Sequence, residues 1–177
     1  MVTPSDPIGL FAQLGSILTR AQIAHALIGG HAVNAWIEPR YTADIDITIQ
    51  ADPAASARLE SALTEGGYVR TLAHGSELPS GPDFVQYRAQ GGRVVLELQA
   101  AKTAFQLELI QRARSIRPGS LRVATPEDLI ILKLIADRPK DQVDLLGLVA
   151  LPDLEWAYIE RWANVWGLDA SLAKLRA

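Results

Sequence analysis

The segment from Tyr41 to Gln50 places two aspartates in a strand-like alternation. Apolar residues take one set of alternate positions, namely Ala43, Ile45, Ile47 and Ile49, and polar residues take the other, namely Thr42, Asp44, Asp46, Thr48 and Gln50. Successive strand side chains point to opposite faces, so Asp44 and Asp46 share one face with their Cα atoms about 7 Å apart. Asp is depleted in strands, and two like charges this close favour a raised pKa or a bound cation.

Two adjacent glycines, Gly29 and Gly30, follow an apolar run from Ile23 to Ile28 that predicts a buried strand. Glycine permits a tight turn and a close approach of the backbone to a ligand. Backbone N–H groups at such a turn can bind phosphate oxygens. The sequence therefore predicts a phosphate-binding turn one short helix before the carboxylate pair.

A third carboxylate, Glu97, lies on the polar face of a second alternating segment, in which Val94, Leu96 and Leu98 form the apolar face. Three carboxylates on neighbouring strands could hold one or two divalent cations, and Mg²⁺ prefers such oxygen ligands together with substrate phosphates. Glu97 could also accept a proton from a nucleophile. This set predicts phosphoryl or nucleotidyl transfer, whereas the structural alternative is the exposed polar face of an edge strand.

The remaining patterns predict an α+β fold in which a mixed sheet flanked by helices precedes a small helical module. Helices are predicted over residues 8–20, 31–37, 53–65, 104–116, 125–136 and 141–149, with a last long one from Asp153. Strands are predicted over 23–28, 43–50, 68–73, 84–89 and 93–99, with a short strand or connector at 121–124. We predict an α/β core over residues 1–120 and a helical module over residues 121–177.

Composition restricts the class of protein further. The chain has 177 residues and no cysteine, which excludes thiol chemistry. Its net charge of −3 is too mild to imply a nucleic-acid-coating surface, but a local patch could still hold nucleic acid as a substrate. Its first residues lack the pattern of a signal peptide, and no apolar run is long enough to span a membrane. A cytoplasmic protein is expected.

The chain resembles the nucleotidyltransferase superfamily of DNA polymerase beta type in its Gly29-Gly30 turn, the helix after it, and the motif Arg40-x-Thr42-x-Asp44-x-Asp46. Over residues 20–165 it is most similar to small bacterial nucleotidyltransferases of the abortive-infection toxin group. The further matches are Glu97 eight positions before Phe105, the opening Thr125-Pro-Glu-Asp-Leu, Lys133, and Arg138-Pro-Lys140-Asp141-x-x-Asp144.

This resemblance implies a nucleotidyltransferase that uses Mg²⁺ or Mn²⁺ and a nucleoside triphosphate (NTP) such as ATP. Catalysis and metal binding fall to Asp44, Asp46 and Glu97. Nucleotide binding falls to Gly29, Gly30, Arg40, Thr42, Lys133, Arg138 and Lys140. The acceptor would be tRNA, a protein or a small molecule, and the toxin group implies an antitoxin partner.

Several of these residues have a second interpretation. Arg40 could pair with Asp44 instead of holding a phosphate, and Lys133 could be a surface lysine that snorkels. Arg138 and Lys140 could simply be solvated, or Asp141 and Asp144 could orient them. His31 could contact substrate or only cap its helix, and the tryptophans Trp156, Trp162 and Trp166 are expected in the core of the last helix.

The sequence departs from the family pattern at two positions. Gly30 stands where many active members have serine, and Glu97 stands where aspartate is typical. These departures motivate the alternative of a catalytically inactive member that binds a nucleotide or a partner. Arg40 locked against both aspartates would support that alternative.

Overall fold

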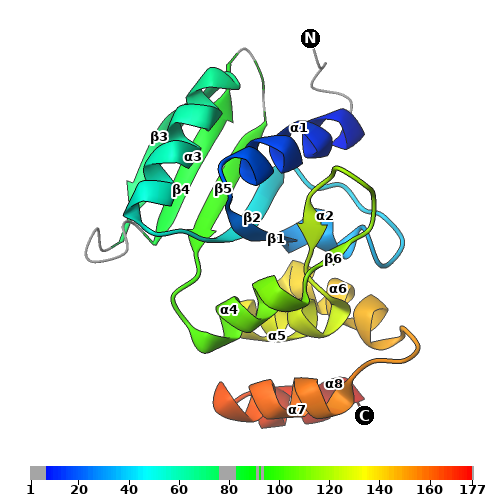
Figure 1. Ribbon diagram of the computed structural model, residues 1–177. Coiled ribbons are helices and arrows are strands. Elements are labelled where there is room, and N and C mark those ends of the chain that lie inside the picture. The colour runs from blue at the N-terminus through cyan, green and yellow to red at the C-terminus, as the bar shows by residue number, and fades with distance from the viewer. Residues whose placement is uncertain (1–6, 76–82, 91, 93, 177) are drawn as a thin grey trace.

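The computed structural model describes residues 7–75, 83–90, 92 and 94–176. Within these residues, seven strands form one sheet in the order β3-β4-β5-β2-β1-β7-β6 (Figure 1). Two pairs, β2 with β5 and β1 with β7, are parallel, and the other neighbours are antiparallel. The predicted α+β fold with a mixed sheet is therefore confirmed.

The centre of the sheet is formed by β1 (Ala24–Ile28), β2 (Asp44–Gln50) and β5 (Val95–Ala100). Because β2 lies between β1 and β5, the interpretation of the Asp-x-Asp segment as an edge strand is wrong. Thr48, on the polar face of β2, is buried. The register places Asp46 between Ile28 of β1 and Glu97 of β5.

The outer strands extend this sheet on both sides. On one side β4 (Phe84–Ala89) pairs with β5, and β3 (Tyr68–His74) pairs with β4 across a register shift between Arg70 and Leu72. On the other side the short strands β7 (Arg122–Val123) and β6 (Arg114–Ser115) follow β1.

Helices cover both faces of the sheet. They are α1 (Pro7–Arg20), α2 (Gly29–Val33), α3 (Pro53–Glu65), α4 (Ala104–Arg112), α5 (Pro126–Ala136), α6 (Pro139–Val149), α7 (Trp156–Val165) and α8 (Asp169–Arg176). Figure 1 shows α1 and α3 on one side, α4, α5 and α6 on the other, and α7 and α8 as a further layer beyond these. In the described residues, no helix is both long and apolar enough to cross a bilayer.

The helix starts follow the predicted capping signals. Asp52 accepts a hydrogen bond from the backbone N–H of Ala55 at the start of α3. Thr125 forms a reciprocal capping box with Asp128 at the start of α5, with Pro126 in the first turn. These caps fix where each helix leaves the sheet.

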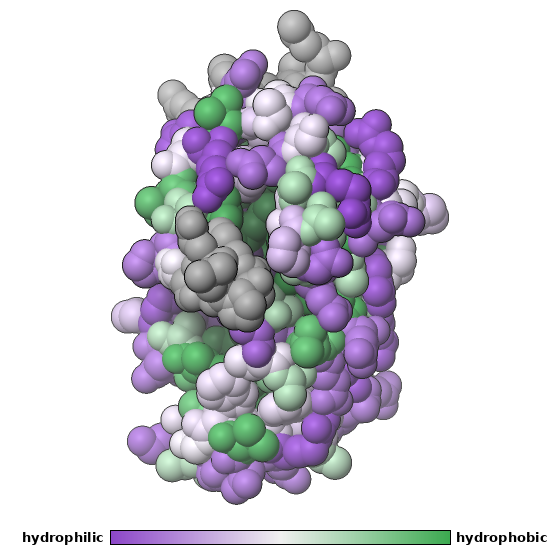
Figure 2. Space-filling view, turned by 60° about the vertical axis from the view of Figure 1, so that its left-hand side comes forward, coloured by the Kyte–Doolittle hydropathy of each residue, from purple (hydrophilic) through white to green (hydrophobic). Residues whose placement is uncertain are grey.

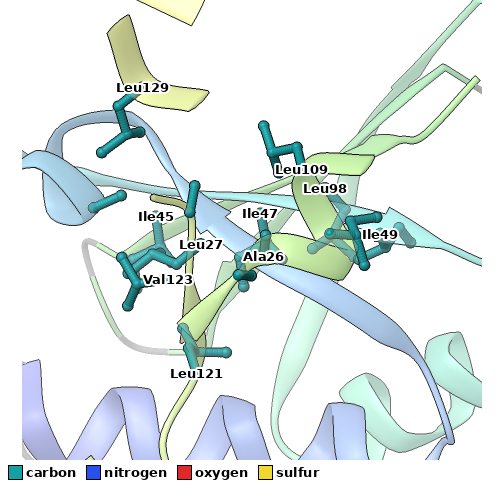
Figure 3. Close-up of a cluster of buried hydrophobic side chains, with 14 of the residues drawn as sticks. Ala26, Leu27, Ile45, Ile47, Ile49, Leu98, Leu109, Leu121, Val123 and Leu129 are labelled. Atoms are coloured by element: carbon teal, nitrogen blue, oxygen red, sulfur yellow. The ribbon is translucent and has the colours of Figure 1, made fainter. Parts of the chain in front are cut away.

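The apolar face of β2 forms the centre of the core. Figure 3 shows Leu27, Ile45 and Val123, from three neighbouring strands, side by side, and all three are buried. The predicted alternation of Ile45, Ile47 and Ile49 is confirmed, since each is at most 9% exposed. On the face of the molecule shown in Figure 2, hydrophilic residues are interspersed with small hydrophobic patches.

The predicted bounds of two helices need correction. The short helix after the glycines is α2, which begins at Gly29 itself and ends at Val33. Helix α4 ends at Arg112, because Ala113 adopts an extended conformation (ψ 139°) and the chain enters β6, so Ile116 is 43% exposed and not inward.

The predicted last helix from Asp153 is in fact two helices. Helix α7 begins at Trp156, and the left-handed Gly167 (φ 67°) separates it from α8. Trp162 is buried as predicted, but Trp166 is 41% exposed at the end of α7.

Some predictions fall outside the described residues. The sequence also predicts a helix cap at Asp6, a loop over residues 74–82 and a hairpin turn at Gln90–Gly92, and all or part of each lies outside those residues. The predicted domain boundary near residue 120 stays a prediction. It lies just before β7, which still pairs with β1 of the sheet.

Candidate active site

The carboxylates of Asp46 and Glu97 lie side by side because β2 and β5 run parallel with these residues in register. Burial raises the pKa of Asp46 to about 7, helped by the charge of Glu97 and a hydrogen bond between the two groups. Asp44, two residues earlier on the same face, is exposed and adds a smaller charge effect. The site is thus a crowded acidic pair with a third carboxylate beside it.

Gly29 lies directly against this pair. Its φ of 66° is left-handed, and a Cβ built on it would enter the carboxylate of Asp46. Only glycine satisfies both conditions. The first turn of α2 therefore begins in contact with Asp46, and the role of this turn in phosphate binding stays a prediction.

Gly30 lies against Thr42 instead. A Cβ on Gly30 would lie 2.5 Å from Thr42 Oγ1 and 2.8 Å from Thr42 Cβ. The space that a side chain at position 30 would occupy thus holds the side chain of Thr42. A hydroxyl is present beside the turn, although it comes from the loop before β2.

Arg40 points to the helical half of the chain and not to the aspartates of β2. Its Nε and Nη2 each donate to Asp144 at 2.6 Å. The side chain of Asn34 holds the Arg40 backbone, donating to its carbonyl at 2.6 Å and accepting from its N–H at 3.0 Å. Within the described residues, no ion pair joins Arg40 to Asp44 or Asp46, so the arrangement expected for an inactive member is not found.

Lys133 lies in the interior, with a side chain only 4% exposed. Its Nζ forms ion pairs with Asp141 at 2.7 Å and Asp144 at 2.6 Å. The interpretation as a snorkelling surface lysine is therefore wrong. Its role in nucleotide binding stays a prediction, since here both of these contacts are to carboxylates of α6.

Asp141 and Asp144 connect this lysine to the two arginines. Burial alone would raise the pKa of Asp141, but hydrogen bonds from Arg138 and Lys133 outweigh it and hold that pKa at about 2. The same balance, with Arg40 in place of Arg138, keeps the pKa of Asp144 below its usual range. Both carboxylates are therefore firmly ionised and orient basic side chains.

Arg138 reaches from the start of α6 toward the acidic pair. Its Nε donates to Asp141 at 2.7 Å, and its charge lowers the pKa of Asp46. The side chain is 54% exposed, so it remains available to a ligand. Lys140 is also exposed, two residues along the chain.

His31 directly follows the two glycines and packs edge-on against Phe11, with ring centroids 5.2 Å apart. Burial lowers the pKa of His31, against an opposing effect of Asp44. The ring packs against Phe11, and a contact of His31 with substrate stays a prediction.

Three polar residues around the site were not predicted from the sequence. Gln86 on β4 donates to Glu97 Oε1 at 3.2 Å, and Thr71 on β3 donates to the Gln86 side chain at 3.0 Å. Asn34 holds the loop that contains Arg40. Gln86 could have been found from its place in a hairpin with the strand of Glu97, had the register been known.

A family model described as "Nucleotidyl transferase AbiEii toxin, Type IV TA system" matches residues 18–160. The chain belongs to this family. The resemblance inferred from the glycine turn and the Asp-x-Asp motif is therefore confirmed, and an AbiEii-type protein is expected to transfer a nucleotide.

Solved structures share the fold of this AbiEii family member. The solution structure of the antibiotic-resistance factor ANT(2'')-Ia is 16% identical over 97% of each chain, with a TM-score of 0.61. A nucleotidyltransferase-like protein from Paracoccidioides brasiliensis is 19% identical over 94% of this chain and 90% of its own, with a TM-score of 0.55. At these identities the similarity supports the fold alone. No curated protein sequence matches the chain.

The donor set fits the divalent cation that an AbiEii nucleotidyltransferase implies. The carboxyl groups of Asp46 and Glu97 are adjacent, and the charge of Glu97 helps to raise the pKa of Asp46. A bound cation would offset this repulsion. Across the described residues, no three His, Asp or Glu side chains already converge as a metal cluster. Binding would therefore require Asp44 to join the pair from its exposed position.

A cleft of about 1280 Å³ lies on the apolar side of this AbiEii-type sheet. Leu27, Ile45 and Val123 form its floor, and none of the three site carboxylates lines it. Arg40 and Thr42 reach its rim. The cleft is thus separate from the acidic pair, on the other face of the strands that position it.

Proposed function

We propose that the protein is a metal-dependent nucleotidyltransferase that moves a nucleoside monophosphate from an NTP to an acceptor hydroxyl. The observation that supports this most strongly is the pairing of Asp46 and Glu97 in register on parallel strands, directly against Gly29. Membership of the AbiEii family supports the same reaction class.

Asp44, Asp46 and Glu97 would hold the metal through their carboxylate oxygens. When bound, Mg²⁺ or Mn²⁺ would supply positive charge to the attacking and leaving oxygens. The acceptor oxygen attacks the α-phosphorus, the bond from that phosphorus to the bridging oxygen of the β-phosphate breaks, and pyrophosphate leaves. Glu97 takes the proton of the acceptor hydroxyl.

The phosphates of the NTP would bind around the start of α2. The backbone N–H groups of Gly29 and Gly30, in the first turn of α2, and the Thr42 hydroxyl would supply donors there. Arg138 supplies a positive charge near Asp46, and Lys140 lies exposed on the same turn of α6. Arg40 and Lys133 support this arrangement through Asp144 and Asp141.

The partners proposed are an NTP, an acceptor that is a tRNA, a protein or a small molecule, and an antitoxin. The antitoxin follows from the family description, which places such proteins in type IV toxin–antitoxin systems. One neighbour of the same fold, ANT(2'')-Ia, has been solved with adenylyl-2''-tobramycin, a small molecule that carries an adenylyl group.

Calorimetry with each NTP and Mg²⁺ tests the proposal. Wild type should bind one NTP, and Asp44→Asn combined with Asp46→Asn should weaken that binding strongly, because the metal bridge to the phosphates is lost. Asp153→Asn is a matched control, since Asp153 is exposed in the loop before α7. Equal NTP affinity in wild type and the double variant would contradict the proposal.

The acceptor can be found separately. Purified protein, a lysate and an NTP labelled at the α-phosphate should give label in RNA, in protein or in a small-molecule fraction. Asp46→Asn should remove the label from that fraction.

A further inference from the structure

Gln86 is the next member of a polar row that crosses the sheet through the candidate site. The register aligns Asp46 of β2 with Glu97 of β5, and Glu97 with Gln86 of β4. The side-chain Nε2 of Gln86 donates to Glu97 Oε1 at 3.2 Å. Glu97 is therefore held from the side opposite Asp46.

Thr71 fixes the orientation of this amide. It lies in the register shift between Arg70, which pairs with Tyr87, and Leu72, which pairs with Gln86. Thr71 is therefore the extra residue of a bulge, and bulges redirect side chains. Its Oγ1 donates to Gln86 Oε1 at 3.0 Å and lies 3.2 Å from the Gln86 carbonyl oxygen.

These two contacts determine which end of the amide faces the carboxylate. Since the amide oxygen accepts from Thr71, the amide NH₂ is directed to Glu97. A glutamate has one more rotatable bond than an aspartate, so its carboxylate loses more freedom when it is fixed in place. A residue that holds the ligand can offset this, as outer hydrogen-bond partners do in metal sites.

We propose that Thr71 and Gln86 are positioning residues that hold the Glu97 carboxylate toward Asp46 for cation binding. This inference rests on the proposed function, because it assigns Glu97 to the metal. It also explains how this chain accommodates a glutamate where relatives have aspartate. The bulge of β3 is then a part of the site, although it lies two strands away.

Titration with Mn²⁺, followed by electron paramagnetic resonance, tests the inference without turnover. Gln86→Leu should weaken Mn²⁺ binding about 10- to 100-fold, the usual loss for an outer partner of a metal ligand. Thr71→Val should cause a smaller loss in the same direction, and Thr71→Ser should restore wild-type affinity because it keeps the hydroxyl. Gln50→Leu is the matched control, at the exposed far end of β2.

A coupling measurement separates positioning from general damage to the sheet. In a Glu97→Gln background, Thr71→Val should produce no further loss of Mn²⁺ affinity, because the carboxylate it acts through is gone. If Gln86→Leu does not fold, the comparison of Thr71→Val with Thr71→Ser still decides.

The outcomes are distinguishable. Unchanged Mn²⁺ affinity in Gln86→Leu and in Thr71→Val, with a wild type that binds, overturns the inference and leaves the proposed function standing. A further loss in the Glu97→Gln background also overturns it. Wild type that binds neither Mn²⁺ nor NTP overturns the proposed function, and this inference with it.

Discussion

Asp46 shows how a single strand residue can report on the site. Its folded pKa is about 7, raised from the model-compound value of 3.8. Between about pH 4 and pH 7 the unfolded chain has lost the Asp46 proton while the folded chain still holds it. The free energy of unfolding therefore decreases as the pH rises through this range. Above pH 7 both states are deprotonated, and the free energy of unfolding has decreased by roughly 4 kcal/mol, which corresponds to the difference between the two pKa values.

We therefore predict that metal-free wild type is less stable at pH 8 than at pH 5. Asp46→Asn should remove most of this difference, because an amide has no proton to lose. Urea denaturation at both pH values measures it. The same pH dependence in wild type and Asp46→Asn would show that another group is responsible.

The second residue-scale prediction concerns the close contact of Gly30 and Thr42. Gly30→Ala should destabilise the protein by about 1–3 kcal/mol, because the new methyl group overlaps the side chain of Thr42. Thr42→Gly should relieve part of this cost, giving a coupling of about 0.5–3 kcal/mol in a double-mutant cycle. Strictly additive effects in thermal denaturation would argue that the loop before β2 moves away freely.

At the scale of elements, the pairing of α5 with α6 depends on buried charge. Lys133 lies between Asp141 and Asp144, which are themselves buried. We predict that Lys133→Met costs about 3–5 kcal/mol, because it leaves two carboxylates without their shared cation. Equilibrium unfolding in urea measures this.

The control for this prediction is Lys174→Met. Lys174 is exposed on α8, so its loss should change the free energy of unfolding by less than about 0.5 kcal/mol. Similar small effects for both lysines would mean that the buried network contributes little.

Most elements could be predicted from the sequence because their signals are local. The alternation around Asp44 and the cap at Thr125 depend on neighbours within a few residues, and both were confirmed. Helix α4 was predicted too long because the pairing of Arg114 and Ser115 with β7 is a contact between segments. No local pattern records such a contact.

In the candidate site too, local patterns could be predicted from the sequence, whereas contacts between distant segments could not. The pairing of Asp46 with Glu97 agrees with the predicted shared polar face, since both segments alternate. The partners of Lys133 and Arg40 were named only in general terms, and the bulge at Thr71 was not foreseen. A bulge changes the register by one residue without changing composition, so the role of Gln86 needed the structure.

At the scale of the whole molecule, a second buried polar cluster joins the outer helices to the rest. Tyr158 of α7 donates to Asp128 of α5, and the guanidinium of Arg112 lies 3.9 Å from the Tyr158 ring centroid. Arg112 also reaches Glu155 at 2.9 Å. This cluster connects α4, α5 and α7.

We predict that Tyr158→Phe destabilises the protein by about 1–3 kcal/mol, because the buried Asp128 loses a donor while the ring packing is kept. Tyr41→Phe is the control, since Tyr41 is 89% exposed. Differential scanning calorimetry of both variants measures this. Equal transition temperatures would mean that Thr125 alone satisfies Asp128.

The ion pair of Arg40 with Asp144 joins positions 104 residues apart in the chain. A ribosome makes the glycine turn and Asp46 well before it makes Asp144. A nascent chain therefore contains the carboxylates long before the loop of Arg40 can be fastened to α6. We therefore expect the proposed nucleotidyl transfer only after α6 has been synthesised and Asp144 can hold Arg40.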